Sequence, residues 1–450
     1  MKILIVSYYF APQNLIGAVR PTKLAKYLAR MGHEVTVICG AGRDGKIDPT
    51  LQRDLAELQD VHLLTEFNPL RYWYMRKKPA QPGAGAAPAK AAAPAQQSGL
   101  KKQVVRAVDA LYRWLRWMSD VHFSRLGRRE LAKLNGPYDA VFSTYAPFSV
   151  HQIAQKARKS GLAKRWIADF RDEVGMPFAC QQGKMESYMH MIRRDADIIS
   201  AVSSGFLEMM HFEDVGRVLS NGFDREDLPA VEAQPATEQL RVVYCGQMQD
   251  SRREVGNRDI RPMFRALAKL VDKGVLTREE IRLVYAGREG RLFAQYAAEA
   301  GLEMCVEDHG QVSREASIAL QKGAGILLMG SHHMSTQKGI LTGKLFEYMM
   351  MDKPIVCCMA GDLPNSGVKQ VLCETGMGFC CEEANAQADE AALQEWLLEK
   401  VRCWRENRSM LGGKDSQRVE NYGYPALACE LAGWMKQETV KGTKEDEQDA

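Results

Sequence analysis

The chain has 450 residues, of which 46% are hydrophobic and 26% charged, and its formal net charge is +4. A single hydrophobic core stops growing at roughly 250 to 300 residues, so this length predicts two domains. The net charge is too small to indicate nucleic-acid binding, and no run reaches the ~20 apolar residues of a membrane-spanning helix. Residues 1–7 run directly into tyrosines without the features of a signal peptide, so we expect a cytoplasmic protein.

Short apolar runs alternate with helical patterns through both halves of the chain. This alternation is typical of βα units whose parallel strands are buried on both faces. We therefore expect an α/β protein of two Rossmann-like, doubly wound domains that face each other across a cleft, in residues 1–228 and 238–415. The polar stretch 225–239 joins them, because Pro229 and Pro235 disfavour helix there. The expected strands are residues 2–7, 34–39, 61–64, 140–143, 166–169 and 198–202, then 241–245, 282–286, 325–329, 354–358 and 377–381.

An insertion interrupts the first domain. Residues 78–98 are almost entirely Ala, Pro, Gly and Gln, too weakly apolar to offset the entropy of ordering, so a flexible loop is expected. An amphipathic helix at about 101–118 follows, and it has two interpretations. It is either an ordinary surface helix packed on the first domain, or an interfacial helix with arginines at lipid headgroups and Trp114 and Trp117 as anchors. Its apolar stripe consists of Val104, Val108, Leu111, Leu115 and Met118.

The loop after the first strand, residues 8–21, places Gly17 shortly before a helix and Pro21 in the first turn of that helix. Such a loop can present N–H groups to an anion, or Gly17 can simply permit a tight turn. The loop contains no GxGxxG, and the second strand ends in Cys39-Gly40 instead of the acidic residue that holds a dinucleotide ribose. NAD binding is therefore not expected.

A more specific signal lies in the second half, where Gly343 precedes a helix that opens with Lys344 and carries Glu347 one turn later. A cation and a carboxylate at a helix N-terminus suit a nucleoside diphosphate, with Lys344 at the phosphates and Glu347 at the ribose hydroxyls. The alternative is a surface ion pair on an exposed helix.

Short motifs recur in a fixed order through both halves. They are the opening loop through Gly17, Gly32-His33-Glu34-Val35-Thr36-Val37, Asp169-Phe170-Arg171-Asp172, Ala201-Val202-Ser203, Ser220-Asn221-Gly222-Phe223-Asp224, Val243-Tyr244-Cys245-Gly246, Tyr285-Ala286-Gly287, His309-Gly310-Gln311-Val312 and Gly343-Lys344-Leu345-Phe346-Glu347-Tyr348. In their order and spacing the chain resembles glycosyltransferase family 4 (glycosyl transferases group 1), which are retaining enzymes of GT-B fold. The resemblance covers most of the chain outside 67–134. It implies that 238–415 binds the donor, that 1–228 lies on the acceptor side, and that 416–450 holds a crossover helix and a disordered acidic tail.

The resemblance also implies roles for individual residues of the second domain. Glu347 is expected to bind the donor ribose, Lys344 to lie near the donor phosphates or sugar, and Arg258 to neutralise the leaving diphosphate. Gly246 is expected to allow close backbone approach. The nucleobase is expected to meet the segment containing Gln311 and Val312.

Two positions depart from the family's pattern. The first glutamate of the usual E-x7-E is Gly339 here, which removes the residue expected to contact hydroxyls of the donor sugar. The arginine often found after the glycine that matches Gly246 is Gln247, for which Arg252 or Arg253 is a possible substitute.

The acceptor side is expected to use residues of the first domain. Asp169, Arg171 and Asp172 follow the end of an expected strand, where they can serve catalysis or form a salt-bridged loop. His151 is a further candidate, and its place inside an expected helix leaves a structural role equally open.

Two short segments contain residue types that bind metal ions. Asp195-Ala196-Asp197 directly precedes an apolar strand, and His332-His333 has no further ligand at a suitable spacing. We expect no metal, and no cofactor beyond the nucleotide-sugar substrate.

Together these features predict a retaining, metal-independent glycosyltransferase. It is expected to move a sugar from a UDP- or GDP-sugar to a glycan or polyprenol-linked acceptor in surface polysaccharide biosynthesis, with a possible peripheral contact to the cytoplasmic membrane face. Nucleic acid is not an expected partner. The alternatives are a UDP-sugar epimerase of the same fold and a catalytically inactive scaffold that binds nucleotide sugars.

Overall fold

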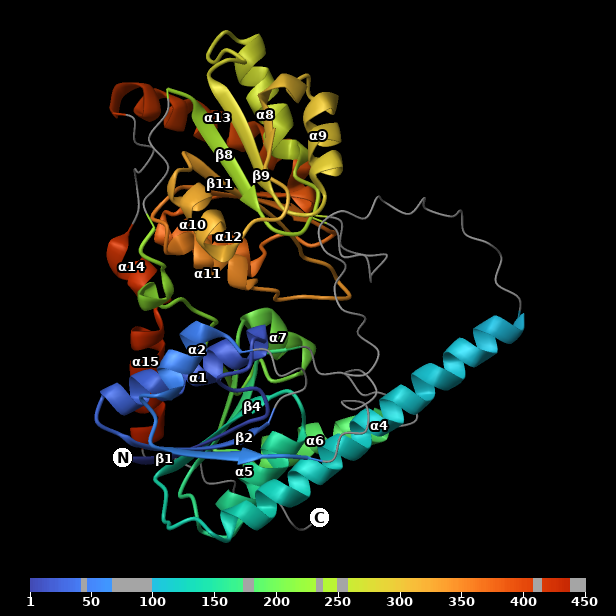
Figure 1. Ribbon diagram of the computed structural model, residues 1–450, viewed down its shortest axis with the longest axis vertical. Coiled ribbons are helices and arrows are strands. Elements are labelled where there is room, and N and C mark those ends of the chain that lie inside the picture. Colours follow the sequence, from blue (N-terminus) through green and yellow to red (C-terminus); the bar gives the residue numbers. More distant parts are fainter. Residues whose placement is uncertain are drawn as a thin grey trace, which may run out of the picture. The chain divides into compact units, whose positions relative to one another are not determined.

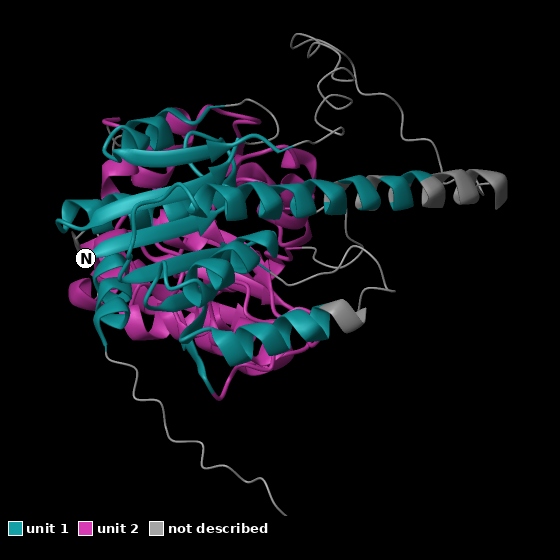
Figure 2. Ribbon diagram, turned by 90° about the horizontal axis from the view of Figure 1, so that it is seen from below, with its two compact units in different colours: residues 1–200, 215–217, 428–450 teal, residues 201–214, 218–427 magenta. Residues whose placement is uncertain are grey.

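The computed structural model describes residues 1–41, 47–66, 99–172, 182–231, 238–248, 258–407 and 415–437. The chain divides into two compact units, coloured separately in Figure 2. Unit 1 comprises Met1–Ser200, Val215–Arg217 and Ala428–Ala450, and unit 2 comprises Ala201–Asp214 and Val218–Leu427. Three predicted features lie outside the described residues: the loop 78–98, the possible substitutes Arg252 and Arg253, and the acidic tail beyond residue 437.

Unit 1 is built on a seven-stranded sheet in the order β3-β2-β1-β4-β5-β6-β7. Strand β1 pairs in parallel with β2 and β4, and β4 pairs in parallel with β5. Residues Ile3 to Val6 of β1 are fully buried in succession, as expected for a strand covered on both faces. The strands are β1 (Lys2–Ser7), β2 (Glu34–Gly40), β3 (Asp60–Leu64), β4 (Ala140–Tyr145), β5 (Trp166–Phe170), β6 (Ile198–Ala201) and β7 (Gly216–Val218).

The helices of unit 1 cover this sheet (Figure 1). Helix α1 (Ile16–Arg30) contacts β1 and β2, and α5 (Ser149–Lys159) contacts β1 and β4. Helix α4 (Gly99–Leu131) packs against α5 and continues well past the predicted end at Met118. The other helices are α2 (Pro49–Leu55), α6 (Gln182–Asp195) and α15 (Tyr424–Lys436), the last of which belongs to unit 1 from Ala428 onward.

Unit 2 is built on a six-stranded sheet in the order β10-β9-β8-β11-β12-β13, in which every neighbouring pair is parallel. Successive side chains of β8 point to opposite faces, so Val242 and Tyr244 join one core while Val243 and Cys245 join the other. The strands are β8 (Leu240–Cys245), β9 (Ile281–Ala286), β10 (Val306–Asp308), β11 (Ile326–His332), β12 (Ile355–Ala360) and β13 (Gly378–Glu382).

Each face of the unit 2 sheet has its own helical layer. Helices α8 (Arg261–Asp272), α9 (Gly290–Glu299) and α13 (Ala386–Asn407) supply the first core. Helices α10 (Arg314–Lys322), α11 (Gly343–Met349) and α12 (Gly367–Thr375) supply the second. The short elements are α7 (Ser204–Met209), α14 (Ser416–Glu420), η2 (Arg225–Asp227), η3 (Glu303–Cys305) and η4 (Glu383–Asn385).

The prediction of two doubly wound α/β domains is confirmed. Two edge strands, β7 and β10, were not predicted, because each has only three residues and none of them is buried. Within the described part of the chain, no helix combines the length and apolar character that crossing a bilayer requires.

Candidate functional site

Five of the predicted donor-binding residues gather at one edge of the unit 2 sheet, whereas Gly17, also predicted to bind the donor, belongs to unit 1. Gly246 directly follows β8, the pair Gln311 and Val312 follows β10, and α11 with Lys344 and Glu347 follows β11. Because β10, β9, β8 and β11 are neighbours and parallel, their carboxyl ends meet at this edge. Ligands of open parallel sheets bind at the carboxyl ends of the strands. Five residues from separate segments therefore share the expected edge.

Lys344 lies over the end of β8. Its Nζ sits 4.2 Å from the centre of the Tyr244 ring. Gly246 has a φ of 117°, which only glycine adopts readily, and a Cβ at this position would lie 2.8 Å from the Lys344 Nζ. The glycine is therefore required both by its backbone conformation and by the lysine that passes it.

The Lys344 ammonium is buried without a hydrogen-bond partner among the described residues. Burial, with a smaller contribution from the nearby charge of Arg258, lowers the pKa of Lys344 to about 8. A buried polar group normally has a partner, since leaving one unpaired costs about 1–3 kcal/mol. An unpaired ammonium next to a second cation is a favourable place for an anion.

Arg258 is held beside this ammonium by backbone contacts. Its Nη1 donates to the carbonyl of Gln247 at 2.6 Å, and its own backbone N–H donates to the carbonyl of Met248 at 3.2 Å. Gly330 of β11 makes room for it, because a Cβ there would lie 2.6 Å from the Arg258 Cβ. Gln247, where an arginine was expected, thus contributes its carbonyl oxygen to positioning Arg258.

Glu347 lies one turn after Lys344 and is partly exposed. Its Oε1 accepts a hydrogen bond of 2.8 Å from Nε2 of Gln321, and its Oε2 lies 3.9 Å from Nη1 of Arg314. Gln321 is fully buried and also donates to Ser317 Oγ at 3.1 Å. The sequence reasoning missed Gln321. The available signal was its spacing of four residues from Ser317 on α10, which places both on one side of the helix.

The segment after β10 is more open. Gln311 is exposed, while Val312 is half-buried and packs on the second core. The preceding Gly310 has a φ of 61°, and its N–H donates to Oδ1 of Asp308. An apolar side chain next to an exposed amide is compatible with a nucleobase.

Gly339 has a structural reason to lack the expected glutamate side chain. Its φ is 73°, and a Cβ would lie 2.4 Å from Ser203 Oγ and 2.7 Å from the backbone nitrogen of Phe206. Ser203 also donates a hydrogen bond of 2.7 Å to the Gly339 carbonyl. The backbone at this position lies directly against the start of α7, so no side chain fits.

In unit 1, Asp169 is a fully buried carboxylate with both oxygens in use. Its Oδ1 accepts from Arg20 at 3.1 Å and from Ser200 at 2.8 Å, and its Oδ2 accepts from Thr144 at 2.7 Å and from Arg20. These partners lie on α1, β4 and β6. Asp169 therefore links these three elements by hydrogen bonds. A catalytic role for Asp169 stays a prediction.

Arg171 is buried and supports the start of α1, which begins at Ile16, so Gly17 lies inside the helix and Pro21 lies beyond its first turn, contrary to the prediction. Its Nη1 donates to the carbonyl of Gly17 at 2.6 Å and its Nε to the carbonyl of Tyr145 at 2.7 Å. A Cβ at Gly17 would lie 2.3 Å from this Nη1, so the glycine leaves space for the guanidinium. Asp172 differs from both neighbours, because its side chain is 61% exposed and lies 3.9 Å from Arg171. Of the three candidates Asp169, Arg171 and Asp172, the last is thus the one open to solvent.

His151 lies inside the unit 1 core. Its Nδ1 is 2.8 Å from Ser143 Oγ, and the rings of Phe148 and Phe170 lie close to it. Burial lowers the pKa of His151 to about 3, so the ring is neutral at physiological pH. These surroundings favour the structural interpretation, and the catalytic one stays a prediction.

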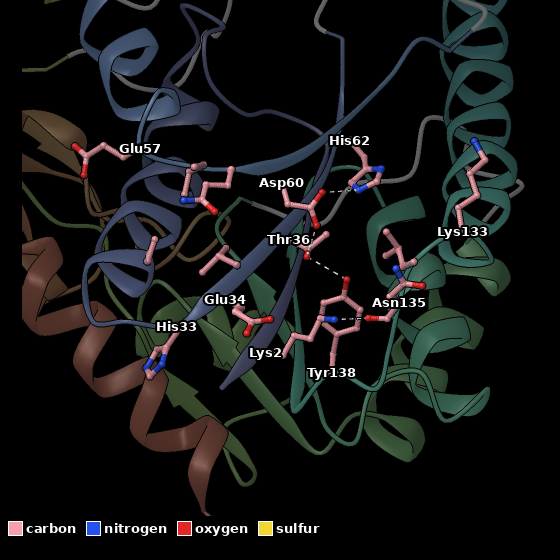
Figure 3. Close-up of a pocket in the computed structure, with 15 residues that line it drawn as sticks. Lys2, His33, Glu34, Thr36, Glu57, Asp60, His62, Lys133, Asn135 and Tyr138 are labelled. Carbon is pink, nitrogen blue, oxygen red and sulfur yellow. Dashed lines mark hydrogen bonds and ion pairs between the residues drawn. The ribbon is translucent and has the colours of Figure 1, made fainter.

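A cavity of about 540 Å³ lies at the opposite, amino-terminal edge of the unit 1 sheet (Figure 3). Its side chains form a chain of hydrogen bonds, from Tyr138 through Thr36 at 3.0 Å, Asp60 at 2.7 Å and His62 at 2.9 Å, to Glu130 of α4 at 2.8 Å. This network connects the end of α4 with β2 and β3. None of the predicted site residues lines the cavity.

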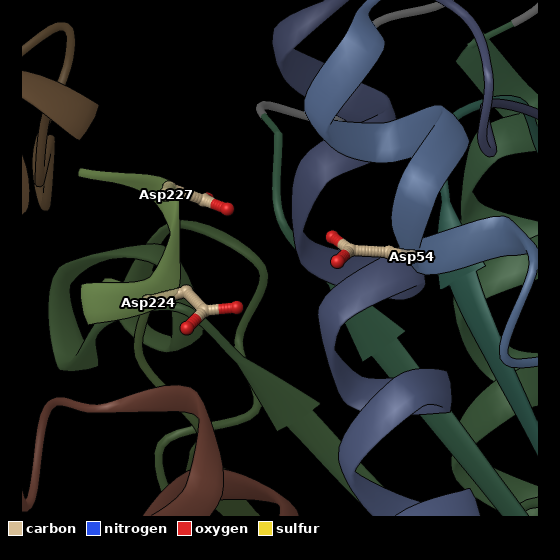
Figure 4. A group of neighbouring side chains, drawn as sticks. All are labelled: Asp54, Asp224 and Asp227. Atoms are coloured by element: carbon tan, nitrogen blue, oxygen red, sulfur yellow. The ribbon is translucent and has the colours of Figure 1, made fainter. Parts of the chain in front are cut away.

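Figure 4 labels three aspartates, of which Asp54 belongs to unit 1 and Asp224 and Asp227 belong to unit 2. Within unit 1, Asp54 is paired with the Nζ atoms of Lys23 at 2.5 Å and Lys26 at 3.0 Å. Within unit 2, Asp224 accepts the backbone N–H of Glu226 and caps η2. The expectation of no metal stays a prediction.

Comparisons with known proteins support the fold. No protein-family model matches the chain, and no curated protein matches it. Among solved structures, the N-terminal domain of Candida albicans trehalose-6-phosphate phosphatase is similar with a TM-score of 0.59 and 14% identity, covering 96% of each chain. Sucrose-phosphate synthase from Thermosynechococcus elongatus has a TM-score of 0.54 and 16% identity, covering 96% of this chain and 98% of its own. The lipopolysaccharide outer core galactosyltransferase WaaB has a TM-score of 0.51 and 14% identity, with the same coverage. At these identities the likeness shows a shared fold.

Proposed function

We propose that this chain, which has the GT-B fold of these neighbours, is a retaining, metal-independent glycosyltransferase that uses a UDP- or GDP-sugar. The observation that carries the proposal is the buried ammonium of Lys344, which has no hydrogen-bond partner among the described residues and lies beside Arg258, one helical turn before Glu347. A bound diphosphate would supply the negative counter-charge for this ammonium.

The chemistry follows from where charge develops. When the sugar leaves the donor, negative charge grows on the departing diphosphate, and fixed cations in a site of low dielectric constant stabilise that charge more than water would. Lys344 and Arg258 are such cations, and their backbone and aromatic contacts hold them in place before substrate binds. No metal is needed in this proposal, because two cationic side chains take its role.

Glu347 is proposed to accept hydrogen bonds from the two ribose hydroxyls. Gln321 already donates to its Oε1, which fixes the orientation of the carboxylate. Oε2 has Arg314 only at 3.9 Å, a distance beyond a normal hydrogen bond. The nucleobase is proposed to lie at Gln311 and Val312. For the acceptor hydroxyl the proposal keeps Asp172, whose carboxylate is exposed.

The acceptor is proposed to be a glycan or a polyprenol-linked sugar, used in surface polysaccharide synthesis at the cytoplasmic face of a membrane. The resemblance to glycosyltransferase family 4 supports this assignment. Release of free sugar or an altered nucleotide sugar without any acceptor would instead indicate an epimerase of the same fold.

The test combines binding and turnover. Purified protein is screened by thermal shift against UDP, GDP, ADP and their sugars, because a ligand that binds only the folded state raises apparent stability by RT ln(1 + [L]/Kd). We expect UDP or GDP to raise the midpoint, and Glu347→Ala and Arg258→Ala to lose that rise. Arg265→Ala is the matched control, since Arg265 is a partly exposed arginine of unit 2 that pairs with Glu390.

Turnover separates the enzyme from a scaffold. Release of nucleoside diphosphate from the preferred donor is measured with and without lipid-linked acceptors from a bacterial extract. A chain that binds nucleotide sugars but releases no nucleotide with any acceptor, and that converts no nucleotide sugar, would be the inactive scaffold. Binding of no nucleotide at all would contradict the proposal.

A further inference from the structure

Helix α4 carries a row of exposed apolar side chains. Val108, Leu111, Trp114 and Met118 have exposed fractions of 54%, 56%, 47% and 40%. Their spacings of three, three and four residues place them on one face of the helix. We call these four side chains the α4 stripe. A continuous row of this kind differs from the single exposed apolar residues that are normal on soluble proteins.

The other face of α4 is firmly packed, which fixes the direction of the stripe. Phe123 is fully buried, and Gly127 lies so close to α5 that a Cβ would be 2.2 Å from Cδ1 of Ile153. Ser124 Oγ donates to Oε1 of Gln152 at 2.8 Å. These contacts occur in the second half of the helix, while the teal part of α4 before them extends past the strands of unit 1 (Figure 2). The packing of α4 on α5 agrees with the interpretation as a surface helix, and it leaves the stripe on the opposite, exposed face.

The charge of α4 matches one kind of partner. Between residues 99 and 131 the sequence has eight Lys and Arg against three Asp and Glu. Arg125 and Arg129 follow Met118 by seven and eleven residues, so they continue the face of the stripe, and both are exposed. The result is one helix face with apolar side chains at one end and guanidinium groups at the other.

We propose that this face of α4 binds the surface of an anionic lipid bilayer. The stripe would enter the boundary between headgroups and acyl chains, where tryptophan is favoured, and Arg125 and Arg129 would contact lipid phosphates. The helix lies in the plane of the interface and does not cross it. This inference does not depend on sugar transfer, because lipid binding is measured with no nucleotide sugar present.

The test is cosedimentation of the full chain with vesicles of phosphatidylcholine alone or with about 30 mol% phosphatidylglycerol as the anionic lipid. We expect strong binding to the anionic vesicles that falls with added salt. The double variant Leu111→Ser/Trp114→Ser is expected to bind at least about tenfold more weakly. Met304→Ser is the matched control, because Met304 is 82% exposed on unit 2 and should leave binding unchanged.

A second pair of variants tests the charge. Arg125→Glu/Arg129→Glu is expected to remove the preference for anionic vesicles while the melting temperature stays unchanged, since both side chains are exposed. Quenching of Trp fluorescence by brominated lipid gives an independent readout, which Trp114→Phe should reduce.

Three results would overturn the inference. The first is failure of the wild-type chain to sediment with anionic vesicles, and the second is a Leu111→Ser/Trp114→Ser variant that sediments as well as the wild type. The third is a wild-type dimer that the same variant converts to a monomer in light scattering, which would show that a second copy of the chain covers the stripe instead.

Discussion

We expect nucleotide binding to depend on pH through Lys344. The ammonium must be protonated to pair with a diphosphate, and burial lowers the pKa of Lys344 in the free protein to about 8. Raising the pH from 7 to 9 takes Lys344 of the free protein from mostly protonated to mostly neutral. At pH 9 the lysine must therefore take up a proton from solvent when the nucleotide binds, which weakens binding. We expect the Kd for UDP or GDP, measured by calorimetry, to rise about tenfold over this interval.

Lys344→Met is the control for this pH dependence. The variant should bind the nucleotide weakly at every pH, with a flat profile between 7 and 9. An unchanged profile in the variant would show that another group titrates, and that Lys344 does not contact the phosphates.

Asp169 gives a second prediction at the scale of a single residue. Replacing it by asparagine keeps the shape but leaves the buried guanidinium of Arg20 without its counter-charge. Breaking a buried ion pair in this way costs about 3–5 kcal/mol, so Asp169→Asn should lower the free energy of unfolding of unit 1 by roughly that amount. Denaturant unfolding followed by circular dichroism measures the loss.

Asp172→Asn is the matched comparison for Asp169→Asn. Its side chain is exposed, so stability should change by less than about 0.5 kcal/mol, and an effect on kcat would support the proposed acceptor role. Equal losses of stability for both variants would contradict the structural role of Asp169.

At the scale of elements, the apolar runs predicted the central strands because buried parallel strands are apolar throughout. The same reasoning missed β7 and β10, which are short edge strands without buried residues. It also ended α4 too early. The exposed stripe stops at Met118, and a different face with Phe123 and Gly127 becomes buried after it, so the apolar pattern that marked the helix no longer continues.

The sequence allowed more of the candidate site to be predicted in unit 2 than in unit 1. Lys344 and Glu347 carry a local signal, a glycine followed by a cation and a carboxylate at a helix start. For Gln321 the spacing from Ser317 was a weak local signal, and its contact with Glu347, which joins residues 26 positions apart, could not be read from the sequence. Arg171 was predicted as a candidate for catalysis, but its bond to the Gly17 carbonyl spans 154 positions and depends on the fold of the whole sheet.

The loop between β11 and α11 gives a prediction that belongs to this scale. Gly339 combines a positive φ with a close approach to α7, whereas Gly274, with a φ of 67°, has open space around it, and a Cβ added there would meet nothing within 4 Å. Gly339→Ala should therefore cost more than the ~1–2 kcal/mol expected for Gly274→Ala, whose cost is conformational alone. Thermal unfolding of the two variants measures the difference. Equal costs would show that α7 yields to the added methyl group.

At the scale of the whole molecule, each unit has its own sheet and its own buried residues, so we expect each to respond separately to a ligand. All the residues proposed for the donor belong to unit 2. A nucleotide at about 100 times its Kd stabilises the structure that binds it by about 2.7 kcal/mol. This stabilisation should therefore act on the opening of unit 2, while unit 1 gains little.

Hydrogen exchange with and without UDP or GDP tests this expectation. Slower exchange is expected in α10, which contains Gln321, and in α11, which contains Lys344. It is also expected in the segment after β8, which leads to Arg258. The amides of β1 and β4 in unit 1 serve as the internal reference. In Lys344→Met the same nucleotide concentration should leave exchange in α11 unchanged. If the nucleotide protected β1 and β4 as strongly as α11 in the wild-type chain, the assignment of donor binding to unit 2 alone would be wrong.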